Sequence, residues 1–167
     1  MTAQVAEKLT YQDQTLAMCS EPLDGYLASC GRDIRFQGLS TACWRGYIGR
    51  WEVKGDRLYI TGITATLENG NSATLKDLFP DFPNGAFAHW FTGEIRCPMG
   101  KQLKYVHMGY ATQFEKDLFL TFKSGVLVAE RIVKNGDSDR PDAPTQYGPG
   151  GWVSYPAKTK GPTEDSR

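Results

Sequence analysis

The sequence has no excess charge of either sign and no long apolar run. Lysine and arginine together number 19, as do aspartate and glutamate, and the pI is near 6.7. Proteins that bind duplex nucleic acid usually carry a basic excess, so a nucleic-acid partner is not expected. A membrane-spanning helix needs about 18 apolar residues in a row. No such run is present, and no membrane association is expected.

The sequence also lacks the short motifs that mark common catalytic and cofactor sites. It contains no glycine-rich phosphate loop, no dinucleotide fingerprint, no nucleophile elbow and no His-Glu-x-x-His pattern. There is no Cys-x-x-Cys pair and no cluster of cysteine with histidine, which a structural zinc site would need. We therefore expect no metal and no cofactor.

The N-terminus indicates the compartment, and the compartment indicates the expected state of the four cysteines. No basic segment followed by an apolar one stands at the N-terminus, so the sequence predicts a cytoplasmic protein without a signal peptide. In that compartment, cysteines of a domain this size are expected to be buried free thiols. Their even number leaves a disulfide open among Cys19, Cys30, Cys43 and Cys97.

What the sequence does have is glycine, proline and aromatic residues in quantity. Among 167 residues are 18 glycines and nine prolines, and 12% of the residues are aromatic. The clearest strand is 42–53, which the turn at Lys54–Asp56 joins to a returning strand over 57–67. Further short strands are predicted within 8–19, 85–97, 103–111, 118–122 and 126–133, with a turn at 98–101 and a short helix at 74–79.

Many strands joined by short turns favour a mainly β fold over a parallel α/β fold. We expect one antiparallel domain over residues 1–134, a sandwich or a partly open barrel with one or two short helices. Residues 135–167 hold five of the nine prolines, so a Pro/Gly-rich tail is expected there. Disorder is predicted for 136–145, whereas the aromatic residues within 147–155 indicate docking onto the body or a partner.

Three blocks of sequence together resemble a family of small, uncharacterised bacterial proteins. They are Trp44–Val53, Phe87–Arg96 and Tyr105–Tyr110, the last followed by Glu115. The resemblance covers roughly Leu9–Val133. It implies a bacterial, cytosolic origin, but the family has no established activity and contributes no catalytic residues.

One hypothesis for the blocks is catalytic. Histidine titrates near neutral pH, and a carboxylate can orient it. His107 is therefore the candidate base of a small hydrolase or isomerase that acts on a polar or anionic substrate. Glu94 and Glu115 are the candidate acids. The alternative is that His107 is a hydrogen-bonded residue of a sheet.

A second hypothesis is a ligand-binding pocket built from aromatic and cationic side chains. Arg45 lies between aromatic residues, and either pairs with a buried carboxylate or enters a pocket as an anion site. Its expected carboxylate partners are Glu52, Glu94 or Glu115. The candidate ligand-binding residues are Arg45, Tyr47, Trp90, Arg96 and Tyr105.

Because no catalytic motif is present, the first functional hypothesis is a non-catalytic binding or interaction protein, immunity-like or accessory. Its partner is then another protein or a small polar ligand. The alternatives are the small enzyme built on His107 and a β-barrel that holds one small ligand. The strand end Glu130–Lys134 is a further candidate, since an exposed strand can pair with itself or with a partner.

Overall fold

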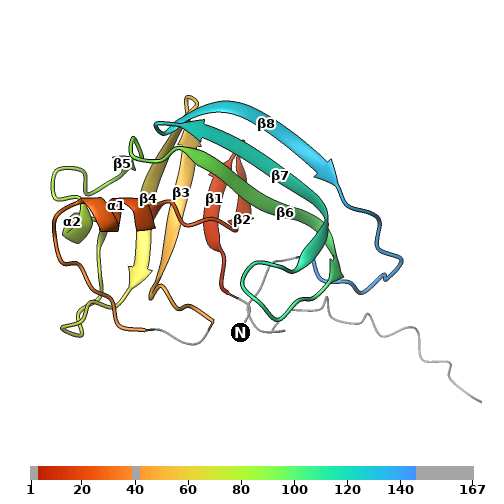
Figure 1. Cartoon of the computed structure of the whole chain (residues 1–167), viewed down its shortest axis with the longest axis horizontal. Helices are drawn as coiled ribbons and strands as arrows, with labels where there is room; N and C mark the ends of the chain where they lie inside the picture. Colours follow the sequence, from red (N-terminus) through yellow and green to blue (C-terminus); the bar gives the residue numbers. More distant parts are fainter. Residues whose placement is uncertain (1–3, 39–41, 146–167) are drawn as a thin grey trace, which may run out of the picture.

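The computed structural model describes residues 4–38 and 42–145 of the chain. Eight strands and two short helices make up this part (Figure 1). The elements are β1 Glu7–Tyr11, β2 Gln14–Met18, α1 Leu23–Ser29, β3 Tyr47–Lys54, β4 Arg57–Ala65, α2 Leu75–Leu78, β5 Ala86–Phe87, β6 Gly93–Lys104, β7 Gln113–Lys123 and β8 Val126–Lys134.

The strands form one strongly curved sheet that does not close into a barrel (Figure 1). Their order is β2-β1-β3-β4-β8-β7-β6, and β5 pairs with β4 outside this path. The two end strands approach each other, because the backbone N–H of Cys19 donates to the carbonyl of Arg96 at 2.8 Å. The predicted mainly β fold of the partly open type, with two short helices, is confirmed.

One strand pair departs from the expected antiparallel arrangement. β1 and β3 run parallel, with Leu9 opposite Trp51. Parallel neighbours need a long connection rather than a hairpin. Here β2, α1 and the segment after it supply that connection and return the chain to the starting end of β1. The sheet is therefore mixed, with a parallel pair within an otherwise antiparallel order.

The hairpin predicted from β3 and β4 is present, and its turn has the geometry that such a hairpin needs. Gly55 and Asp56 both have positive φ, at 52° and 61°. Two consecutive positive φ values match the twist of the flanking strands, and glycine and aspartate tolerate them best. A register shift between Arg50 and Trp51, next to Gly49, marks a local irregularity in the pairing of β3 with β4.

The prediction for the region around Pro98 is wrong in two respects. The expected turn at 98–101 is part of β6, which runs unbroken from Gly93 to Lys104. Register shifts against β7 after Met99 absorb the irregular residues. Proline is tolerated because β6 is the last strand of the sheet, so one side of its backbone has no ladder to maintain. The strand expected over 103–111 ends at Lys104.

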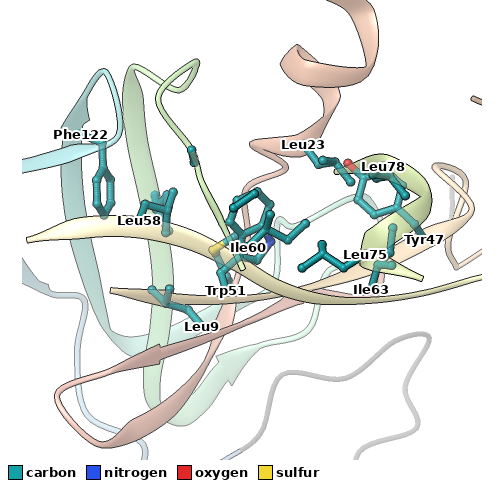
Figure 2. Packing of buried hydrophobic residues seen from close by; sticks show 14 of the residues in the cluster. Leu9, Leu23, Tyr47, Trp51, Leu58, Ile60, Ile63, Leu75, Leu78 and Phe122 are labelled. Atoms are coloured by element: carbon teal, nitrogen blue, oxygen red, sulfur yellow. The ribbon is translucent and has the colours of Figure 1, made fainter. Parts of the chain in front are cut away.

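The core lies inside the curve of the sheet, under the two helices. Figure 2 shows Trp51 and Ile60 packed together, with Leu23 of α1 and Leu78 of α2 on the helical side. Trp51 is 1% exposed and Leu78 is fully buried. Burying a large apolar side chain contributes roughly 1.5–3 kcal/mol. The helices therefore complete the core at the open side of the sheet.

The segment after β8 does not behave as predicted. Disorder was expected for 136–145, but this segment lies on the body of the protein. The backbone N–H of Ser138 donates to Glu115, and the N–H of Gln102 donates to the carbonyl of Pro144 at 2.6 Å. Ala143 is 1% exposed. The predicted docking site 147–155 lies outside the described residues.

All four cysteines are free thiols, as predicted, but the predicted burial is correct for only two of them. Cys43 and Cys97 are buried, whereas Cys19 and Cys30 are partly exposed. α1 has seven residues and α2 four, so neither of the described helices could cross a bilayer.

Candidate functional site

A pocket lined almost entirely by rings lies between β4 and the segment that follows α2. Its volume is about 560 Å³. β4 contributes Tyr59 and α1 contributes Tyr26, and the chain between α2 and β6 supplies the rest. The lining rings are Tyr26, Tyr59, Phe79, Phe82, Phe87, His89 and Trp90, with Asp81 as the acidic group among them.

Local structure explains why this loop presents rings. Thr74 caps α2 together with Asp77, which closes a capping box. The helix ends at Leu78, and Pro80 then prevents its continuation. A turn in which the N–H of Phe82 donates to the carbonyl of Phe79 at 3.0 Å carries the chain outward. The two phenylalanines therefore stand on either side of one tight turn.

The floor of this pocket is held firmly. The indole of Trp90 stacks on the ring of Phe79 at 14° and 5.6 Å, and its Nε1–H donates to the carbonyl of Pro22 at 2.8 Å. The ring of Tyr26 lies 4.9 Å from that of Trp90. Its hydroxyl donates to the carbonyl of Leu78. Three rings are thus positioned by packing and hydrogen bonds before any ligand arrives.

The rim of the pocket is open and carries an exposed ring. Phe82 is 60% exposed, which is unusual for so large an apolar side chain. A second hollow of about 510 Å³ adjoins the first and shares Tyr59, Asp81 and Phe82 with it. Glu52 and Lys54 line this outer part. The site therefore offers an aromatic interior and a charged mouth.

A separate cluster of polar groups is buried between β1, β3 and α1. Arg45 Nε donates to Glu7 Oε1 at 2.8 Å, and the two side chains are 5% and 0% exposed. Trp51 Nε1 donates to the other oxygen of Glu7 at 3.2 Å. Arg45 Nη1 lies 3.5 Å from Glu21. Both terminal nitrogens of Arg45 are buried and make no hydrogen bond to any residue that the structure describes.

Burial changes the titration of this cluster. Desolvation raises the pKa of Glu7 to about 7, against the opposing effect of Arg45. Burial also raises the pKa of Glu21, although the hydroxyl of Tyr110 donates to this carboxylate at 2.7 Å. The ion pair holds β1 and β3 in their parallel register, in which Lys8 lies opposite Arg50. Its role is thus structural first, since each charge depends on the other for compensation.

The structure places Arg45 in a buried ion pair, which is one of the two expected outcomes, but with another partner. Glu7 takes this role rather than Glu52, Glu94 or Glu115. Tyr47 is 1% exposed and donates its hydroxyl to Asp24 at 2.5 Å. Both residues therefore belong to the interior.

Arg96 also lies in a structural network. Its Nε donates to Asp117 at 2.8 Å, and its terminal nitrogens donate to the carbonyls of Tyr110 and Thr112. These bonds join Arg96 of β6 to β7 and to the loop between the two strands. Of the predicted ligand-binding residues, Trp90 is the one that lines the aromatic pocket.

The predicted catalytic residues make separate contacts. The hydroxyl of Tyr105 lies 2.9 Å from Nδ1 of His107, but both residues lie after the end of β6 and not on the predicted strand. Glu94 instead accepts from Arg131 on β8 at 3.0 Å. Glu115 accepts from the backbone N–H groups of Lys101 and Ser138, which lowers its pKa. The structure joins neither glutamate to His107 through any contact among the residues it describes.

Several site residues were missed from the sequence. Glu7 reads as a solvent-facing residue at the start of a strand, and only the parallel pairing with β3 brings it to Arg45. Phe79 and Phe82 were interpreted as part of a short helix and a proline corner. The proline-framed aromatic run 79–83 was the available signal, because rings next to a rigid corner cannot all pack inward.

No group of three His, Cys, Asp or Glu side chains able to hold a metal ion occurs in the described part of the chain. Comparison with family models, with curated proteins and with solved structures gives no match. The resemblance of the three sequence blocks to a bacterial family stays an expectation.

Proposed function

We propose that this chain is a non-catalytic binding protein that takes a small planar aromatic molecule in the pocket around Trp90. The observation that carries the proposal is the lining itself. Rings surround a hollow of about 560 Å³, a volume typical of small-molecule sites. A flat ligand gains both apolar burial and ring stacking there.

The polar groups of the pocket restrict the class of ligand further. Asp81 and His89 are the titratable lining residues besides the tyrosines, and Glu52 and Lys54 stand at the mouth. A small number of polar groups around an apolar interior orients a ligand, whereas the apolar lining provides most of the affinity. The ligand is therefore an aromatic ring system with at least one polar substituent, which is directed toward the mouth.

Binding is favoured over the hydrolase or isomerase alternative. That alternative needs a carboxylic acid beside His107. The side chain in contact with His107 is Tyr105, whose hydroxyl is not such an acid. Glu94 and Glu115 are engaged by Arg131 and by backbone N–H groups. A cytoplasmic location is part of the proposal, and four free thiols support it, since thiols stay reduced there.

The test is a fluorescence titration with N-phenyl-1-naphthylamine, a neutral aromatic probe. The probe should bind to the unmodified protein with enhanced emission. Replacing the exposed ring in Phe82→Ala should weaken binding about tenfold, which corresponds to about 1.4 kcal/mol. The fold should survive, because Phe82 is 60% exposed.

Trp44→Ala is the matched control. Trp44 is 56% exposed and does not line this pocket. Its removal should leave the affinity unchanged. Equal affinity of Phe82→Ala and the unmodified protein would show that the probe binds elsewhere, and the proposal would then be abandoned.

A further inference from the structure

One edge of β8 has almost no partner strand among the residues that the structure describes. The strand pairs with β7 from Val126 to Lys134. On its other side it meets β4 at a single pair, Arg57 with Val126, next to a bond from the N–H of Leu127 to the carbonyl of Asp56. Beyond Leu127 no strand in the described residues pairs with this edge. Figure 1 shows β8 diverging from β4 as the outermost strand along the top of the view.

This edge carries little of the usual protection against pairing. Edge strands are normally short, or interrupted by proline, bulges or inward-pointing charges. β8 is nine residues long and contains no proline, and after one register shift at Val128 it pairs with β7 without interruption from Ala129 to Lys134. Val128 and Ile132 are 58% and 57% exposed. Ile132 lies opposite the buried Leu118 and so points to the core side of the sheet, yet nothing in the described chain covers it.

We propose that β8 pairs antiparallel with β8 of a second copy of this chain, about a twofold axis at Ile132. Two identical edges related by such an axis are self-complementary. In an antiparallel pair, residues directly opposite each other have their side chains on the same face of the sheet. The twofold axis must therefore pass through a residue position and not between two residues. In this register Ile132 packs against the partner's Ile132. Glu130 lies opposite the partner's Lys134. By the same symmetry, Lys134 lies opposite the partner's Glu130.

Charge selects this register over its neighbours. An axis at Glu130 would place two carboxylates opposite each other, and an axis at Arg131 would place two guanidinium groups opposite each other. Like charges directly across a strand pair are unfavourable, whereas opposite charges and apolar pairs are favourable. Only the axis at Ile132 joins an apolar central pair to two opposite-charge pairs.

The side chains concerned are available for this role. Lys134 reaches Asp137 at 3.4 Å, but the two are 62% and 77% exposed, so little holds them together. Glu130 accepts from the hydroxyl of Tyr11 through Oε2. Its Oε1 can accept from the partner's Lys134. Dimerisation would extend the sheet across two copies and cover the exposed apolar residues of β8.

Sedimentation equilibrium of the full chain tests the interface. A dimer is expected, and Ile132→Glu should raise its dissociation constant at least about tenfold. Met108→Glu is the control, because Met108 is exposed but lies outside the sheet. Lys134→Glu should weaken the dimer, and the double exchange Glu130→Lys with Lys134→Glu should restore it. A monomeric chain, or a dimer that survives Ile132→Glu, would overturn the proposal.

Cysteine cross-linking tests the register. The axis places the two copies of residue 132 directly opposite, within the reach of a disulfide. Ile132→Cys should give a covalent dimer under mild oxidation with oxidised dithiothreitol. Val128→Cys should not, since it would lie opposite the partner's Gly136. Cross-linking of Val128→Cys alone, or of neither variant, would contradict this register.

Discussion

At the scale of single residues, Glu7 shows how position decides the chemistry of a side chain. It is fully buried, and three donors converge on its carboxylate: Arg45, Trp51 and the backbone of Gly49. Burial nevertheless outweighs them and raises its pKa from 4.5 to about 7. The folded protein therefore binds a proton at Glu7 more readily than the unfolded chain does.

This shift predicts how stability depends on pH. Because the folded pKa of Glu7 is the higher one, its contribution is complete below pH 4.5 and is lost as the pH rises to about 7. The loss amounts to about 3 kcal/mol of unfolding free energy. Urea unfolding at pH 5 and at pH 7.5 should show it. Burial raises the pKa of Glu21 as well, which adds a change of the same sign.

Glu7→Gln isolates the contribution of Glu7. This variant resembles the protonated form of Glu7, which predominates in the folded protein below about pH 7, so its stability at pH 5 should be close to that of the unmodified protein. Its stability should also fall less between pH 5 and pH 7.5 than that of the unmodified protein. Equal pH dependence in the two proteins would show that Glu7 has an ordinary pKa.

At the scale of elements, β3 depends on a glycine to admit the buried ion pair. A Cβ atom at Gly49 would collide with the carboxylate of Glu7 and lie 2.6 Å from Nε1 of Trp51. Both neighbours are buried and hydrogen-bonded to each other, so neither can move aside cheaply. The strand therefore keeps an open position on its inner face where β1 delivers Glu7.

Gly49→Ala should consequently destabilise the protein by about 2 kcal/mol or more. Chemical denaturation followed by circular dichroism measures this loss. Gly38→Ala is the control, because a Cβ at Gly38 would meet no atom within 4 Å. A stability of Gly49→Ala within error of that control would mean that β1 and β3 separate easily to make room.

At the scale of the whole molecule, the residues after β8 fasten the far side of the sheet. Asn135 Nδ2 donates to Asp117 at 2.8 Å and to the carbonyl of Phe114 at 3.0 Å. Ser138 and Pro144 add bonds to Glu115 and Gln102. This segment thus joins β6 and β7 at the end of the sheet where the register of β6 is irregular.

A charge in this segment tests whether the docking contributes to stability. Ala143→Asp would bury a carboxylate without a partner, and should lower the unfolding free energy by about 2 kcal/mol or more. Pro141→Asp, on an exposed neighbouring residue, should change it little. Similar thermal unfolding of the two variants would show that the segment lies on the body without holding it.

The sequence predicted best where neighbours in the chain decide the outcome. The β3–β4 hairpin followed from alternating side chains and from the Lys-Gly-Asp turn, whose glycine and aspartate accept positive φ. The sequence also allowed a buried ion pair of Arg45 as one of two alternatives, and the structure contains one. The carboxylate that pairs with Arg45 could not be predicted, because Glu7 reaches Arg45 only through the parallel pairing of β1 with β3.

By itself the sequence determined a mainly β chain and the hairpin that β3 and β4 form. Hydrophobic alternation and turn chemistry are local, so they act before the strands find their neighbours. Only the tertiary structure decided that Trp90 lines an aromatic pocket and that Glu94 and Glu115 have partners other than His107. It also decided that, within the described residues, β8 meets β4 at a single pair. These depend on which strands become adjacent and where the sheet fails to close, and such long-range pairing leaves no mark in the order of residues.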